Sequence, residues 1–148
     1  MRRSLGALLA ALVVASACAA DGGASDAKVV QLVMTEFAFA PSPLVLGAGD
    51  RVALKLVNRG SVVHELMAGT GAIRHDGGYT DDLFAGVDMT IRGDVGPAHS
   101  HGAFGVKVKA KGTVTLTFTV PDRTGTYEIG CFEPGHYLAG MVGKIVIE

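Results

Sequence analysis

The sequence predicts an all-β protein built as an antiparallel sandwich or barrel. The chain has 21 glycines among many Val and Thr residues, a composition that favours strands and turns over long helices. Several short stretches alternate apolar and polar side chains, and clusters of Gly, Pro, Asn and Asp separate them. With 148 residues the chain has room for one domain with a hydrophobic core, so we expect a single unit.

The first 20 residues have the order of regions typical of a secretory signal peptide. Two arginines precede an apolar run over residues 5–14, and small residues follow it. Cleavage after Ala20 would remove Cys18, whereas the stretch ASAC resembles a lipoprotein box that would leave Cys18 as the lipidated residue. Both alternatives remain open, with residues 21–27 as a flexible tether. We expect an exported protein, periplasmic or extracytoplasmic, whose only membrane contact would be the lipid anchor of the second alternative.

Residues 28–148 are expected to form the single domain, and its first half contains three strand signals. β-Branched and aromatic residues fill 28–39 (KVVQLVMTEFAF), and two prolines end this predicted strand. Residues 51–57 (RVALKLV) alternate between apolar and polar side chains, as in a half-buried strand. The turn signal NRGS then leads into VVHELM, which places His64 on or beside the next strand.

The second half repeats the alternating pattern after a long interruption. Residues 106–120 (VKVKAKGTVTLTFTV) alternate cleanly, 126–131 (TYEIGC) form a strand ending at its cysteine, and 143–148 (GKIVIE) form a closing strand. Residues 68–103 are rich in Gly and Asp and have no sustained period. We predict a long irregular insertion there, with residues 80–87 (TDDLFAGV) as the one candidate for a short helix.

Charge and cysteine content narrow the functional classes. The formal net charge is −1, which provides no basic surface for nucleic acid. The chain has two cysteines, and either processing of the leader leaves Cys131 without a partner in the domain. In an oxidising compartment an odd cysteine indicates a reactive thiol, an intermolecular bridge or a metal ligand, although a buried inert cysteine is the ordinary alternative.

One stretch gives that cysteine a chemical context. GCFEPGHYLAGMVGK places Cys131, His136 and Met141 five residues apart in a loop bent by proline and glycines, and His64 lies near the end of an earlier strand. Alone, the histidines could be structural and the methionine could be core filler. Together, two imidazoles, one thiolate and a thioether match the ligand set of a blue-copper electron-transfer site. The sequence therefore predicts one copper site with these four ligands.

At these residues the chain resembles the cupredoxins. The resemblance covers residues 36–67 and 106–148, and the Cys-x4-His-x4-Met spacing is closest to rusticyanin-like and sulfocyanin-like members. It implies a Greek-key β-sandwich or barrel and a type 1 copper cycling between Cu(I) and Cu(II). Two histidines and the cysteine would be equatorial ligands, and Met141 would be the long axial one. The chain departs from azurins and plastocyanins at Glu65, where they usually have asparagine, which puts the reduction potential in question.

The resemblance implies a protein that carries single electrons between redox partners in the cell envelope. The alternative is an envelope protein of copper delivery or tolerance that uses the same site. We expect no enzyme, because five histidines in one domain cannot supply a trinuclear cluster and a binuclear centre needs two close cysteines. We expect a monomer that meets its partners transiently, through an apolar patch at Pro134, Tyr137, Leu138 and Ala139.

The remaining histidines and methionines are less informative. The insertion carries His75, His99 and His101, and the last two alternate with small residues in GPAHSHG. They could form a second, weaker metal site or a copper-collecting port, or simply lie in a solvated loop. The scattered Met34, Met67 and Met89 are interpreted as packing residues.

Overall fold

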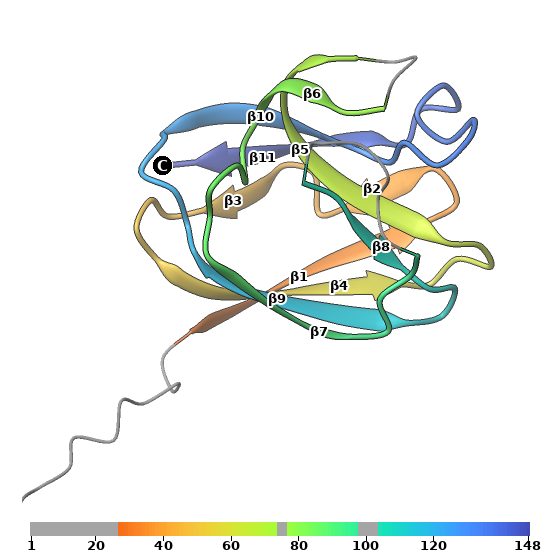
Figure 1. The fold of residues 1–148 in the computed structure, drawn as a ribbon, viewed down its shortest axis with the longest axis horizontal. Coiled ribbons are helices and arrows are strands. Elements are labelled where there is room, and N and C mark those ends of the chain that lie inside the picture. The colour runs from red at the N-terminus through yellow and green to blue at the C-terminus, as the bar shows by residue number, and fades with distance from the viewer. Residues whose placement is uncertain (1–26, 74–76, 98–103) are drawn as a thin grey trace, which may run out of the picture.

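The computed structural model describes residues 27–73, 77–97 and 104–148, which form two β-sheets packed face to face (Figure 1). The strands are Lys28–Thr35 (β1), Ala38–Ala40 (β2), Leu44–Leu46 (β3), Arg51–Asn58 (β4), His64–Ala72 (β5), Tyr79–Asp82 (β6), Met89–Gly93 (β7), Val106–Val108 (β8), Thr113–Thr119 (β9), Gly125–Gly130 (β10) and Val142–Ile147 (β11). One sheet has the order β2-β1-β4-β9-β7, and the other has the order β3-β11-β10-β5-β6, with β8 also paired to β5. The predicted all-β sandwich is confirmed.

Two pairings are parallel, which departs from the expected antiparallel arrangement, although the other pairings are antiparallel. β1 runs parallel to β4, with Lys28 opposite Val52, and β11 runs parallel to β3, with Ile145 opposite Leu44. Between β1 and β4 the chain crosses to the other sheet to form β3 and then returns. A parallel pair needs such a long crossover, which turn signals in the sequence do not reveal.

The single strand predicted over residues 28–39 is instead a hairpin. β1 ends at Thr35, Glu36 and Phe37 form a two-residue turn, and β2 pairs back on β1 with Thr35 opposite Ala38. Phe37 has a φ of 66°, in the left-handed region that usually takes Gly or Asn. Because the turn lacks the Gly, Asn or Asp residues that usually signal a hairpin, the sequence pattern predicted one continuous strand.

The segment expected to be irregular, 68–103, contains strands in its described part. β5 runs on to Ala72, and β6 and β7 add to the two sheets. The candidate helix over 80–87 was wrong, because these residues finish β6 and then form a turn. The Asp82 carboxylate accepts hydrogen bonds from the Phe84 and Phe104 amides (2.8 and 2.7 Å), which fixes the turn and ties it to a later segment.

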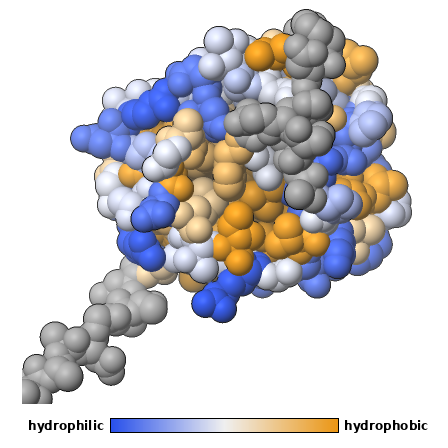
Figure 2. All heavy atoms as spheres, in the orientation of Figure 1, coloured by the Kyte–Doolittle hydropathy of each residue, from blue (hydrophilic) through white to orange (hydrophobic). Residues whose placement is uncertain are grey.

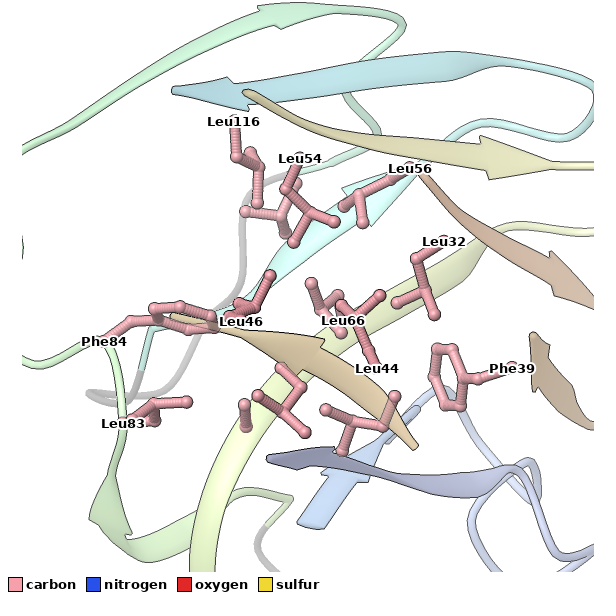
Figure 3. Close-up of a cluster of buried hydrophobic side chains, with 14 of the residues drawn as sticks. Leu32, Phe39, Leu44, Leu46, Leu54, Leu56, Leu66, Leu83, Phe84 and Leu116 are labelled. Atoms are coloured by element: carbon pink, nitrogen blue, oxygen red, sulfur yellow. The ribbon is translucent and has the colours of Figure 1, made fainter. Parts of the chain in front are cut away.

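The core lies between the two sheets and consists of the side chains that alternate inward. Leu54 and Leu56 of β4 and Leu116 of β9 face Leu44 and Leu66 of the opposite sheet (Figure 3). All five are at most 2% exposed. On the outside, hydrophobic residues gather toward the middle of one face and hydrophilic ones surround them (Figure 2). In the interior, burial of the inward-facing side chains between the two sheets fixes the strand register.

Three loops meet at one end of the sandwich, the right-hand end in Figure 1. They are the β1–β2 turn at residues 36–37, the β4–β5 loop at 59–63 and the β10–β11 loop at 131–141. Hydrogen bonds and ring contacts between residues of these loops confirm that they lie side by side. This end therefore brings together segments that are about 100 residues apart in the sequence.

Several predicted features lie outside the described residues. They are the leader and tether up to residue 26, with Cys18, and the histidines His75, His99 and His101. In the described part of the chain, no helix is long and apolar enough to cross a membrane.

Candidate metal centre

His64 is the first residue of β5 and is fully buried. Its position depends on Asn58, which ends β4 and is only 1% exposed. The Asn58 amide donates hydrogen bonds to the carbonyls of Val62 (2.8 Å) and Val108 (3.0 Å), and its oxygen accepts one from the Gly60 amide (2.8 Å). A buried amide with these bonds shapes the loop and fastens it to β8, so His64 enters the strand in a fixed place.

The other predicted ligands lie in the β10–β11 loop, which is closed by its own backbone. Cys131 follows β10 directly, and its amide donates to the Met141 carbonyl (3.2 Å). The Met141 amide donates to the His136 carbonyl (3.0 Å). Gly135 and Gly140 have φ values of 84° and 94°, and a β-carbon at either position would meet open space. Glycine is therefore required at both positions for its positive φ rather than for lack of space, and this backbone conformation lets the loop curl back on itself.

The structure brings His64, Cys131 and His136 together. The two Nδ1 atoms of His64 and His136 lie 3.2 Å apart, and the Cys131 Sγ lies 3.3 Å from His136 Nδ1. All three ligand atoms fall within 4.8 Å of one another. Atoms bound at about 2.0–2.3 Å from one first-row metal ion lie roughly 3–4 Å apart. The three side chains are therefore already spaced to hold one ion, and their nitrogen and sulfur donors are those that copper prefers.

The electrostatics of the centre favour neutral imidazole and an un-ionised thiol until a cation binds. Burial, followed by the neighbouring His136, lowers the pKa of His64. Burial raises the pKa of the Cys131 thiol to about 11, although the Glu65 amide donates to its sulfur (3.3 Å) and opposes the rise. Neutral imidazole is the form that binds metal, and a bound cation removes the proton of a coordinating thiol.

Met141 occupies the far end of the same loop. It is completely buried and belongs to the hydrophobic core cluster, next to the start of β11. Its backbone is hydrogen-bonded to both Cys131 and His136. The structure thus places the fourth predicted ligand within the closed loop that carries two of the others.

The residues around His136 divide into exposed and packed ones. Of the predicted apolar patch, Pro134, Leu138 and Ala139 are exposed, and Leu138 is 79% exposed. Tyr137 is half-buried, because its hydroxyl donates to Glu128 Oε1 (2.6 Å) and its ring stacks on Phe132 at 4.7 Å. The exposed surface of the loop is therefore smaller than the sequence suggested.

Sequence reasoning missed three residues near the centre. Asn58 could have been found, because Asn-x-Gly is a common signal for a side chain that bonds its own backbone two residues on. Glu36 and Phe37 gave no such signal. The Phe37 ring lies edge-on to His136 (centroids 5.3 Å apart, planes at 76°), and Glu36 accepts hydrogen bonds from the Ser61 amide and hydroxyl.

Comparison with characterised proteins identifies copper-binding relatives. The chain is 32% identical over 122 residues to the copper-resistant cuproprotein CopI of Rubrivivax gelatinosus, over 81% of this chain and 66% of that protein. It is 26% identical over 143 residues to the copper-resistant cuproprotein CopI of Pseudomonas aeruginosa, over 84% of this chain and 78% of the relative. The chain thus spans slightly less than two thirds of the first relative's length. No family model matches the sequence.

Solved structures share the fold. Auracyanin B aligns with a TM-score of 0.54 and 28% identity, over 81% of this chain and 88% of its own. Auracyanin A, a blue copper protein from Chloroflexus aurantiacus, aligns with a TM-score of 0.55 and 23% identity, over 83% and 100%. A multicopper oxidase from Campylobacter jejuni shares the fold in 31% of its chain, which covers 85% of this one, with a TM-score of 0.56 and 12% identity.

Proposed function

This chain belongs to the cupredoxin family and has one copper site, and from that premise we propose that it carries single electrons between redox partners in the cell envelope. The observation that carries the proposal is the spacing of three ligand atoms within 4.8 Å of one another. Ligands already gathered in a buried place need little rearrangement between two oxidation states. Low rearrangement is the physical requirement for fast electron transfer.

Each ligand has a distinct task in this proposal. The Nδ1 atoms of His64 and His136 and the Cys131 sulfur would hold the ion, with the Met141 thioether as a weak fourth ligand. When bound, copper supplies a one-electron couple between Cu(I) and Cu(II). The buried strand end fixes His64, and the closed loop fixes the other three, so the protein determines the geometry and the exclusion of water.

His136 is the proposed point of electron exit. It is half-buried, whereas His64 and Cys131 are fully buried, and exposed Pro134, Leu138 and Ala139 surround it in the sequence. A small apolar surface suits brief encounters between a monomer and redox partner proteins. We infer that neither nucleic acid nor a membrane surface is a partner of this domain, apart from the lipid anchor that Cys18 would provide.

Copper tolerance is the second candidate, and the names of the two relatives favour it. Both are copper-resistant cuproproteins. In this role the same ligands would bind copper and pass it on, so that exchange of the ion replaces exchange of the electron. The two candidates differ in how long copper stays bound.

We also infer that the chain is exported and is not an enzyme by itself. The leader pattern supports export. Among the described residues, one group of His, Cys and carboxylate side chains has the spacing to hold a metal ion. Multicopper oxidases need additional copper ions bound by several further histidines, and one such group cannot bind them.

The visible spectrum of the purified protein, before and after one equivalent of Cu(II), tests the site. We expect an intense blue or green band that ascorbate bleaches and an oxidant restores. Cys131→Ser should fold but stay colourless, because the thiolate produces the charge-transfer band. A blue Cys131→Ser variant would overturn the ligand assignment.

Overnight dialysis against a moderate chelator then separates the two candidates. Copper that survives dialysis supports the electron carrier, because a carrier must keep its ion through many cycles. Rapid loss of copper from a blue protein would instead favour delivery or tolerance.

A further inference from the structure

The β1–β2 turn contains a phenylalanine in an unfavourable backbone conformation. Phe37 has a φ of 66°, although a bulky side chain there crowds the backbone. Nevertheless, 43% of the residue is exposed, so burial in the core does not compensate for the strain. Strained residues of this kind cluster at active sites, ligand clamps and switch regions.

The side chain of Phe37 covers one of the two histidines. Its ring lies edge-on to His136, with centroids 5.3 Å apart and planes at 76°. His136 is the more exposed of the two imidazoles and lies in a turn between strands. Phe37 therefore packs against His136, the histidine that lies in a turn, whereas His64 lies in a paired strand.

The other residue of the turn is hydrogen-bonded to the loop that leads to the second histidine. Glu36 Oε1 accepts hydrogen bonds from the Ser61 amide and the Ser61 hydroxyl (2.9 Å for the hydroxyl), in the loop that leads to His64. These bonds lower the pKa of Glu36 to about 2, so the carboxylate is ionised at neutral pH. The turn thus places a fixed negative charge beside the β4–β5 loop.

The Glu36 carboxylate and the His64 imidazole both lie against the same side of Gly60. A β-carbon at Gly60 would lie 2.6 Å from His64 Nε2 and 2.7 Å from Glu36 Oε1. His64 Nε2 is buried and has no hydrogen-bond partner among the residues that the structure describes. Because Nδ1 faces the metal centre, Nε2 is the atom that carries the ring proton when the metal is bound. A metal-bound histidine nearly always donates this proton to a carboxylate, a carbonyl or water.

We propose that the Glu36–Phe37 turn is a clamp that holds both histidines from outside the centre and determines how long copper is retained. Glu36 orients His64 across Gly60, and Phe37 keeps His136 from swinging outward into solvent. The proposal rests on the ligand assignment given above. It makes Glu36 and Phe37 positioning residues, which act on the metal through the two imidazoles.

The strain at Phe37 provides a sharp test, because a merely structural role predicts the opposite result. Phe37→Gly relieves the left-handed conformation and removes the ring from His136. The metal-free variant should be at least as stable to urea as the wild type. Its copper should nevertheless pass to an excess of a Cu(I) chelator about 10 to 100 times faster, the size of effect typical for outer partners of metal ligands.

Two further variants complete the experiment. Lys111→Gly is the matched control for the backbone, because Lys111 is the other non-glycine residue in the described ranges with positive φ (61°), and the hydrogen bond of its side chain goes to the Arg59 carbonyl (2.7 Å) rather than to a ligand. It should release copper at the wild-type rate. Glu36→Gln keeps the shape of the acceptor but removes the charge, and it should release copper faster than the wild type and slower than Phe37→Gly.

The outcomes separate the clamp from the function. A blue wild type with unchanged release from Phe37→Gly would overturn the clamp alone. Equal acceleration in Phe37→Gly and Lys111→Gly would also overturn it, because a general loosening of the turns would then be the cause. A wild type that retains no copper would overturn the ligand assignment and the clamp together. Faster release from Phe37→Gly, with normal urea stability and an unchanged control, supports the clamp.

Discussion

The Nδ1 atoms of His64 and His136 lie 3.2 Å apart, yet the chain holds the two histidines in different ways. His64 begins a nine-residue strand, is completely buried, and is fixed by strand pairing and by Asn58. His136 lies in a half-exposed turn held by loop hydrogen bonds and by the ring of Phe37. His64 is therefore held by the folded core itself, whereas His136 is held by a surface turn that packs against that core. Changes near the first should affect folding, and changes near the second should affect copper.

The largest expected difference separates a strand leucine from a loop leucine. Leu66 lies two residues after His64 and is fully buried, whereas Leu138 lies two residues after His136 and is 79% exposed. Leu66→Ala should lower the free energy of unfolding by about 3 kcal/mol, because it leaves a cavity in the core. Leu138→Ala should change it by less than about 0.5 kcal/mol. Urea unfolding of the metal-free variants measures both, and equal losses would contradict the proposed division.

A smaller effect is expected at Met141, where the loop rejoins the core. Met141→Leu conserves volume, so the free energy of unfolding of the metal-free protein should change by less than about 1.5 kcal/mol. Copper should stay bound, and the reduction potential should rise because a weak ligand is lost. Voltammetry of the blue protein measures the potential. An unchanged potential would exclude Met141 as a ligand.

The smallest effect is expected at the exposed turn and depends on pH. The hydrogen bonds from Ser61 lower the pKa of Glu36 from 4.5 to about 2, so the carboxylate stabilises the folded state above its ordinary pKa. This contribution is lost as the pH falls from about 4.5 toward 2. The metal-free wild type should be slightly more stable than Glu36→Gln at pH 6, and the difference should shrink through that range. A difference that grows on acidification would contradict the assignment.

The fold was predictable wherever one side of a strand faces the core and the other faces water. Residues 51–57 and 113–119 alternate cleanly, and the structure buries their apolar faces. The strand β7 was missed because its alternation, MTIRG, is only five residues long and lies in a segment with no sustained period. The β1–β2 turn was missed because Phe37 takes a conformation that its residue type does not signal.

The three side chains that the structure brings together, His64, Cys131 and His136, were named from the sequence, but the residues that support them were not. Cys131, His136 and Met141 share one loop, so their spacing is visible in the sequence, and His64 could be added because the ligand set needs a second imidazole. The contacts of Glu36 with Ser61 and of Phe37 with His136 join segments 25 and 99 residues apart. Such contacts arise from tertiary packing, which a local pattern does not encode.

The lengths of the strands at the sheet edges also bear on the tendency of the protein to aggregate. The strands at the four outer edges of the sheets, β2, β7, β3 and β6, are three to five residues long, whereas their inner neighbours have six to nine. An edge strand presents unpaired amides and carbonyls that a second chain can use to extend the sheet. Short edges offer few such groups in register. The short lengths of these outer strands therefore disfavour edge-to-edge aggregation through them.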